Sequence, residues 1–184
     1  MEPNWLEELR DAIHQNAVDH GWWPEEFAEE SRDLDEVLAL MVSEVSELLE
    51  AYRHGTLDAE CGKTGLALTN LEEELADVAI RLLDLCGHRG ISPLYYDFAL
   101  VRPYGRSFGG QCFSLIKIIT QADLVEKSDY ENDFWAGRVL MQLMAMYRAW
   151  HSFEPTHPQQ FWNAVRAKHA YNQGRPHRHG GLKA

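Results

Sequence analysis

The sequence has no long hydrophobic run. Its longest apolar stretches are about five residues, such as Leu38–Val42, whereas a membrane-spanning helix needs roughly 20. Met1–Asn4 also lacks the basic and apolar regions of a signal peptide. Cysteine is scarce as well: Cys61, Cys86 and Cys112 form no Cys-x-x-Cys pair, which argues against a disulfide framework or a zinc site. We therefore expect a cytoplasmic chain with no membrane partner.

Positive charge is also in short supply. The chain carries 17 Lys and Arg against 29 Asp and Glu, a net charge of −12, which argues against long nucleic acid as a partner. Residues 25–77 are rich in Asp and Glu, whereas residues 164–183 contain several Lys and Arg. This distribution suits a small anion bridged by metal ions, or simply two solvated faces of opposite sign.

No alternating strand pattern and no Asn-Gly hairpin signal appear in the 184 residues. Apolar residues instead recur at helical spacing almost throughout, which predicts an all-α fold. Ordinary composition and this length indicate a single domain. We expect a first helix from about 5 to near 21, a second over about 35–54, and a third that opens at 69–72 and ends near 87 or 90. Helical periodicity returns over 113–119 and 136–150, a final helix begins near 156–159 and continues to 172, and 91–110 form a connecting loop. Thr69 and Glu72 have the spacing of a capping box at the start of the third helix.

The second predicted helix carries Glu44 and Glu47, and the third carries Glu74 and Asp77. Residues three apart on a helix are neighbours on its surface, with about 5–6 Å between Cβ atoms. Each pair borders the apolar stripe of its helix. If the two helices pack side by side, the four carboxylates face one another.

Such a cluster is unfavourable without neutralising charge. Two like charges 4 Å apart repel by about 4 kcal/mol at an effective dielectric constant near 20. Oxygen ligands alone favour hard cations, with Mg²⁺ ahead of Mn²⁺. Solvated helix faces remain the alternative interpretation. A di-iron bundle is disfavoured because it needs Glu-x-x-His on two helices, and the single example, Glu154–His157, contains a proline.

Residues 38–50 and 74–84 resemble the MazG-like all-α nucleoside triphosphate pyrophosphohydrolases, whose signature is Glu-x-x-Glu, a variable spacer and Glu-x-x-Asp. Residues 168–181 are similar to the C-terminal stretch of phage and bacterial MazG-like proteins. The resemblance covers 4–92 and 158–183. It implies one MazG-like antiparallel helical bundle over 1–184, with a helical insertion over about 93–157 and an extended tail over 175–184.

The resemblance also implies a hydrolase that cleaves a nucleoside triphosphate to the monophosphate and pyrophosphate. Glu44, Glu47, Glu74 and Asp77 would hold magnesium, and water would attack the α-phosphorus. Catalysis would then rest on positioning and charge stabilisation. Members of the family suggest a homodimer or homotetramer.

Substrate contacts are implied at both ends of the chain. Lys168 and Asn172 lie four residues apart on one helical face and would reach phosphate or sugar oxygens, with Arg175 nearby. Trp22 or Trp23 would stack on the base. The other interpretations are a surface lysine for Lys168 and a core position for at least one of the two tryptophans.

Two alternatives to this function stay open. One is phosphoribosyl-ATP pyrophosphohydrolase, which resembles the same motif set and would act on that intermediate rather than on dNTPs. The other is a non-catalytic helical module that binds a nucleotide or a partner.

Overall fold

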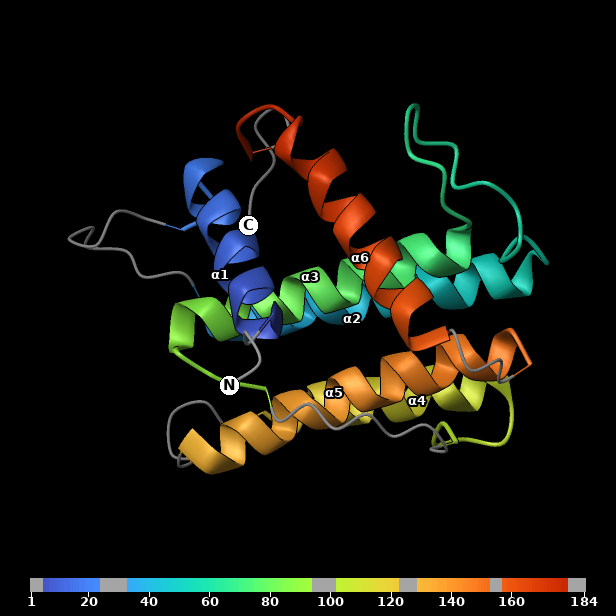
Figure 1. Cartoon of the computed structure of the whole chain (residues 1–184). Helices are drawn as coiled ribbons and strands as arrows, with labels where there is room; N and C mark the ends of the chain where they lie inside the picture. Colours follow the sequence, from blue (N-terminus) through green and yellow to red (C-terminus); the bar gives the residue numbers. More distant parts are fainter. Residues whose placement is uncertain (1–4, 24–32, 94–101, 123–128, 153–156, 179–184) are drawn as a thin grey trace.

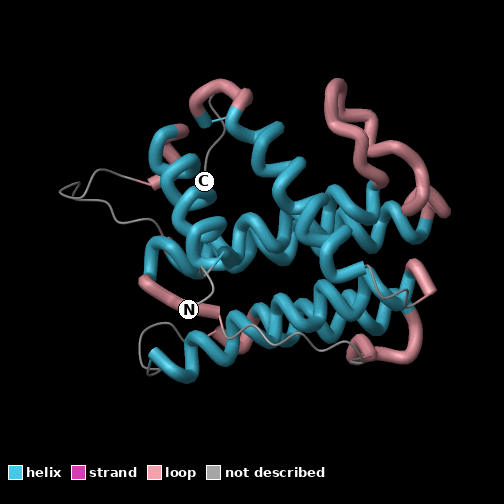
Figure 2. Tube along the Cα trace, in the orientation of Figure 1, coloured by secondary structure: helices cyan, strands magenta, loops and turns pink. Residues whose placement is uncertain are grey.

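The structure is a computed structural model that describes residues 5–23, 33–93, 102–122, 129–152 and 157–178. Within these ranges every regular element is a helix, and the single β-bridge joins Glu60 to Thr69 (Figure 2). The all-α prediction is therefore confirmed for the described chain. The helices are α1 (Trp5–Asp19), α2 (Leu34–Arg53), α3 (Asn70–Arg89), α4 (Phe108–Ile119), α5 (Asp129–Trp150) and α6 (His157–Gln173).

Helix α3 is the centre of the molecule. It packs along α2, and the α4–α5 pair lies against this α2–α3 layer on one side (Figure 1). Helices α1 and α6 both cross α3 on the other side. Because neighbours surround it, α3 buries residues on nearly its whole circumference, including the glutamates Glu73 and Glu74. In the described residues no helix has the length and apolar character needed to cross a membrane.

Side-chain caps fix the ends of the two helices that carry the acidic motifs. Asp33 caps α2 by accepting a hydrogen bond from the backbone N–H of Asp35. The predicted capping box of α3 is confirmed: Thr69 accepts from the Glu72 backbone, and the Glu72 carboxylate accepts from the Thr69 N–H. Gly90 ends α3 in the left-handed conformation, with φ of 66°. These caps set where along α3 each carboxylate lies.

Replacing Thr69 with Ala removes one half of the capping box. We expect the free energy of unfolding to fall by about 1 kcal/mol, measured by urea unfolding of the full chain. Thr64→Ala is the matched control, since Thr64 is exposed in a turn and its replacement should change stability by less than about 0.5 kcal/mol. Equal stabilities of the two variants would contradict a structural role for the cap.

The predicted loop over 91–110 is too long at its C-terminal end, because α4 already begins at Phe108. Two glycines follow, at 109 and 110, and glycine ordinarily signals a turn. Here Ser107 caps the helix by accepting from the N–H of Gly110. Phe108 is buried in the core, so capping and burial outweigh the low helix propensity of glycine.

The segment after α6 also differs from the extended tail expected over 175–184. Residues 175–178 turn back onto the end of α1, where His20 Nε2 lies 2.9 Å from the carbonyl oxygen of Arg175. Arg178 donates its backbone N–H to His20 and its Nε to Gly21. Gly21 has φ of 76°, and a Cβ there would lie 2.0 Å from the His177 ring. Residues 179–184 lie outside the described chain.

Candidate metal centre

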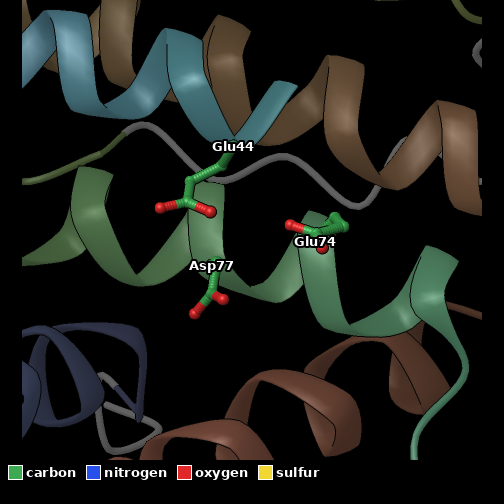
Figure 3. A group of neighbouring side chains, drawn as sticks. All are labelled: Glu44, Glu74 and Asp77. Atoms are coloured by element: carbon green, nitrogen blue, oxygen red, sulfur yellow. The ribbon is translucent and has the colours of Figure 1, made fainter. Parts of the chain in front are cut away.

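Three carboxylates from α2 and α3 converge where the two helices pack. One oxygen from each of Glu44, Glu74 and Asp77 lies within 4.8 Å of the others. We call these three residues the acidic cluster. Figure 3 shows that Glu44 comes from α2 and the other two from α3. The spacing of the two motifs predicted this convergence.

Glu47, the fourth predicted ligand, is not part of this group. It lies exposed on α2, because three residues along a helix turn a side chain about 60° further round the axis. Glu44 faces α3, and Glu47 stands at the rim. Burial, followed by the charge of Glu44, raises the pKa of Glu47. Its own charge in turn raises the pKa of Glu74, so it belongs to the same electrostatic environment.

Arg81, one turn beyond Asp77 on α3, pairs with Glu44 across the helix interface. Its Nε and Nη2 lie 2.7 and 2.6 Å from Oε1 of Glu44. The arginine therefore orients a carboxylate of the acidic cluster. Both contacts go to the same oxygen, and a carboxylate has two.

Lys168 approaches the acidic cluster from α6. Its side chain is 1% exposed, and Nζ lies 2.6 Å from Oδ2 of Asp77. Nζ also donates to Glu73, which receives Lys63 from the loop before α3 as well. Burial would raise the pKa of Glu73, but hydrogen bonds from Asp77 and the two lysines lower it to about 2. Lys168, predicted to contact phosphate, is thus part of the carboxylate network.

Glu74 differs from the other two carboxylates of the acidic cluster, because Glu44 pairs with Arg81 and Asp77 with Lys168 whereas no described cation pairs with Glu74. Its Oε2 is buried and has no hydrogen-bond partner. Burial, together with the charges of Glu73 and Asp77, raises the pKa of Glu74 to about 9. The pKa of Asp77 is raised to about 7, chiefly by burial. Near neutral pH the metal-free chain therefore keeps a proton on Glu74.

The charges balance only in part. Carboxylates outnumber cationic side chains by two in this region: the anions are Glu44, Glu47, Glu73, Glu74 and Asp77, and the cations are Lys63, Arg81 and Lys168. Either protons or one divalent cation would remove the excess. Oxygen donors on two fixed helices and an orphaned buried carboxylate oxygen fit Mg²⁺ or Mn²⁺.

The two predicted base contacts have different environments. Trp23 is buried and stacks on His88, with ring centroids 3.7 Å apart. Its Nε1 donates to Asp84 at 2.8 Å, and His14 Nδ1 lies 2.8 Å from the same oxygen. Trp23 is therefore a core residue that builds the α1–α3 contact. Trp22 is only half-buried.

The remaining substrate candidates lie near the end of α6. Asn172 lies one turn beyond Lys168, and its Oδ1 is buried without a hydrogen-bond partner. Arg175 is half-buried in the turn that rests on α1. The structure brings Lys168 to the acidic cluster. The contact of Arg175 is with His20 at the end of α1 instead.

Sequence reasoning did not identify the roles of Glu73 and Lys63 in this network. One signal was present. Lys168 falls on the apolar stripe of its helix, with Phe161 and Val165, where a charged side chain is rarely buried unless it is paired. The Glu72–Glu74 run offered a partner on the neighbouring motif, but only the packing of α6 on α3 shows which glutamate it is.

No family model, no curated protein and no solved structure matches this chain.

Proposed function

We propose that the chain is a Mg²⁺-dependent nucleoside triphosphate pyrophosphohydrolase of the MazG-like kind. The observation that carries the proposal is the acidic cluster: three carboxylates from two helices within 4.8 Å, one of which is buried and unpaired. The resemblance in residues 38–50 and 74–84 supplies the reaction. The bundle of α1, α2, α3 and α6 would be the MazG-like part, and α4–α5 the insertion.

Glu44, Glu74 and Asp77 would hold the metal, with Glu47 available at the rim. Mg²⁺, when bound, supplies positive charge that holds a triphosphate against the carboxylates and stabilises charge in the transition state. Water attacks the α-phosphorus, the bond to the bridging oxygen of pyrophosphate breaks, and the nucleoside monophosphate leaves separately. No residue of the chain becomes covalently modified.

The chain's other residues position these groups. Arg81 fixes Glu44 by two contacts to one oxygen, which leaves the second oxygen for a metal. Glu73 holds Lys168 beside Asp77, so its ammonium group would offset part of the negative charge of a polyphosphate bound at the metal. Asn172 on the same face of α6 offers a polar group without a partner.

The base would lie toward α1. Asp77 and Asp84 are seven residues apart on α3, about 10 Å along the axis, and Asp84 holds the Trp23–His14 contact. A base bound beyond the sugar would meet this region, with Trp22 as a stacking face. We expect Trp23 to support the base-binding region by packing beneath it rather than by contacting the base.

The test is a pyrophosphate-release assay on the wild-type chain with a panel of dNTPs, NTPs and phosphoribosyl-ATP. We expect Mg²⁺-dependent release from at least one dNTP or NTP, abolished by EDTA. In ¹⁸O-labelled water the label should enter the monophosphate, since attack is at the α-phosphorus. Turnover of phosphoribosyl-ATP alone would support the sibling enzyme. Absence of all turnover with Mg²⁺ or Mn²⁺ would contradict the proposal and favour a binding module.

A further inference from the structure

The outer face of α4 and α5 carries most of the exposed large aromatic residues of the described chain. Tyr104 is 51% exposed, Phe113 62%, Tyr130 67% and Phe134 49%. Large apolar side chains gathered on one surface commonly mark a binding site. This surface lies on the far side of the α2–α3 layer from α1 and α6 (Figure 1).

Each of the two helices presents one stripe to this face. On α4 the stripe passes through Phe113 and Lys117 to Gln121, just past the end of the helix. On α5 the stripe consists of Tyr130, Phe134 and Arg138, which are also four residues apart. Residues four apart share a helix face, so the α4 stripe combines one aromatic ring with a cation and the α5 stripe combines two with a cation.

Two adjoining cavities lie between the stripes, of about 240 and 300 Å³. Both are lined by Gln121 and Arg138, so they form one continuous hollow, which we call the α4–α5 groove. The first cavity adds Tyr104 and Lys117 to its walls, and the second adds Phe134. Together they fall within the roughly 300–1,000 Å³ that small ligands occupy.

Buried hydrogen bonds hold the walls of the groove in place. The side chain of Gln142, which is 1% exposed, accepts from the N–H of Tyr104 at 2.9 Å and donates to its carbonyl at 3.1 Å. Trp135 donates its Nε1 to the carbonyl of Ile118 at 2.8 Å. A preformed groove binds with less loss of conformational freedom than one that must order itself.

The charge of the groove is unusual for this chain. Although the net charge is −12, Lys117 and Arg138 make no ion pair with a described carboxylate. Lys117 lies 5.9 Å from the centre of the Phe113 ring, and Arg138 makes a 3.4 Å contact with Gln121. Among the described residues that line the groove, Lys117 and Arg138 are basic and Glu131 is acidic.

We infer that the α4–α5 groove is a second binding site, separate from the acidic cluster, for a small anion that carries a flat ring, such as a nucleoside diphosphate. Lys117 and Arg138 would take the phosphates, and the exposed aromatic rings that line the groove, Tyr104, Tyr130 and Phe134, would stack on the base. The inference does not rest on the proposed function, because none of these residues belongs to the acidic cluster.

The test is calorimetric titration of the full chain with ADP in EDTA, where no metal supports binding at the acidic cluster. We expect saturable binding with Kd below about 1 mM. Adenosine and inorganic pyrophosphate, which supply the ring and the anion alone, should each bind about tenfold more weakly or worse. The double variant Lys117→Gln/Arg138→Gln should lose at least about tenfold in ADP affinity.

The matched control is Arg53→Gln/Arg166→Gln, which removes the same charge from two exposed positions elsewhere and should leave ADP affinity within about twofold. Circular dichroism verifies that each variant is folded. Absence of saturable ADP binding, or equal ADP affinity in the groove variant and the wild type, would overturn the inference. Sedimentation offers a further outcome that would overturn the inference: the wild type is a dimer, the double variant Phe113→Ser/Phe134→Ser is a monomer, and ADP does not bind. The exposed aromatic face would then be the interface with a second copy of the chain. Loss of pyrophosphate release in acidic-cluster variants leaves this result unaffected.

Discussion

Glu74→Gln is expected to reduce Mg²⁺-dependent pyrophosphate release by about 1,000-fold or more while making the metal-free chain more stable. The activity falls because the amide cannot replace an anionic ligand, and metal stabilisation of the transition state amounts to several kcal/mol, with each 1.4 kcal/mol being tenfold in rate. Stability rises because Glu74 Oε2 is buried without a partner and the amide is neutral at every pH.

The pH dependence of stability tests the same residue without an activity assay. The pKa of Glu74 is about 9 in the folded chain and near 4.5 in the unfolded one. Between these values the folded, metal-free chain binds more protons than the unfolded chain, so the free energy of unfolding falls as pH rises. Asp77, with a pKa of about 7, contributes in the same direction up to that pH.

We therefore expect the wild type in EDTA to lose stability from pH 5 to pH 9, and Glu74→Gln to show a flatter profile. At pH 8 the variant should be more stable by about 2 kcal/mol or more, since one unit of pKa shift corresponds to about 1.4 kcal/mol. Glu50→Gln is the control, because Glu50 is an exposed residue of α2 that pairs with Arg53. Parallel profiles for wild type and Glu74→Gln would show that Glu74 is not a buried, destabilised carboxyl.

The affinity of the chain for Mg²⁺ should rise with pH, whereas the stability of the metal-free chain falls. A metal displaces the proton from Glu74, so apparent Mg²⁺ affinity should rise by up to tenfold per pH unit between about pH 7 and 9, one proton being released. Calorimetry in two buffers of different ionisation enthalpy counts that proton. Affinity that is independent of pH would mean that Glu74 takes no part in holding the metal.

Lys168→Met is expected to destabilise the folded chain by about 3–5 kcal/mol. The substitution keeps an unbranched side chain that is one atom shorter and removes a cation that is 1% exposed and contacts Glu73 and Asp77. Removing one partner of a buried ion pair leaves the other charge uncompensated. A loss of this size is a large part of the 5–15 kcal/mol that stabilises a typical domain.

Urea unfolding at pH 7 measures this loss, with Arg166→Met as the control because Arg166 is an exposed residue of the same helix. The control should change stability by less than about 0.5 kcal/mol. Adding Asp77→Asn to Lys168→Met should recover part of the loss, since it removes one of the carboxylates left without its partner. A Lys168→Met variant as stable as the control would mean that the lysine contributes little to the network.

The approximate bounds of α1, α2, α3 and α6 followed from the sequence, because apolar spacing and caps are local properties. Helices α4 and α5 begin at Phe108 and Asp129, before the periodicity expected from 113 and 136. The box formed by Thr69 and Glu72 needs only residues of the same turn. Position 108 was harder to interpret: two glycines suggest a loop, whereas burial of Phe108 in the core is a tertiary effect that overrides propensity.

The candidate site was predictable in part. Two motifs of three-residue spacing on neighbouring helices placed Glu44, Glu74 and Asp77 together. The same spacing did not distinguish Glu47, since a helix turns 60° between the two positions and only the direction of α3 decides which one faces it. The roles of Glu73 and Lys168 depend on α6 crossing α3, a contact between residues 95 positions apart.

By itself, the sequence determined that the chain is helical, that it carries an excess of negative charge, and that acidic pairs recur on two consecutive helices. The tertiary structure decided which of those acids are buried, which receive a lysine or arginine, and which one, Glu74, keeps an oxygen without a partner. The reason is that helix formation depends on neighbours within a turn or two, whereas the charge state of a carboxyl depends on everything packed around it.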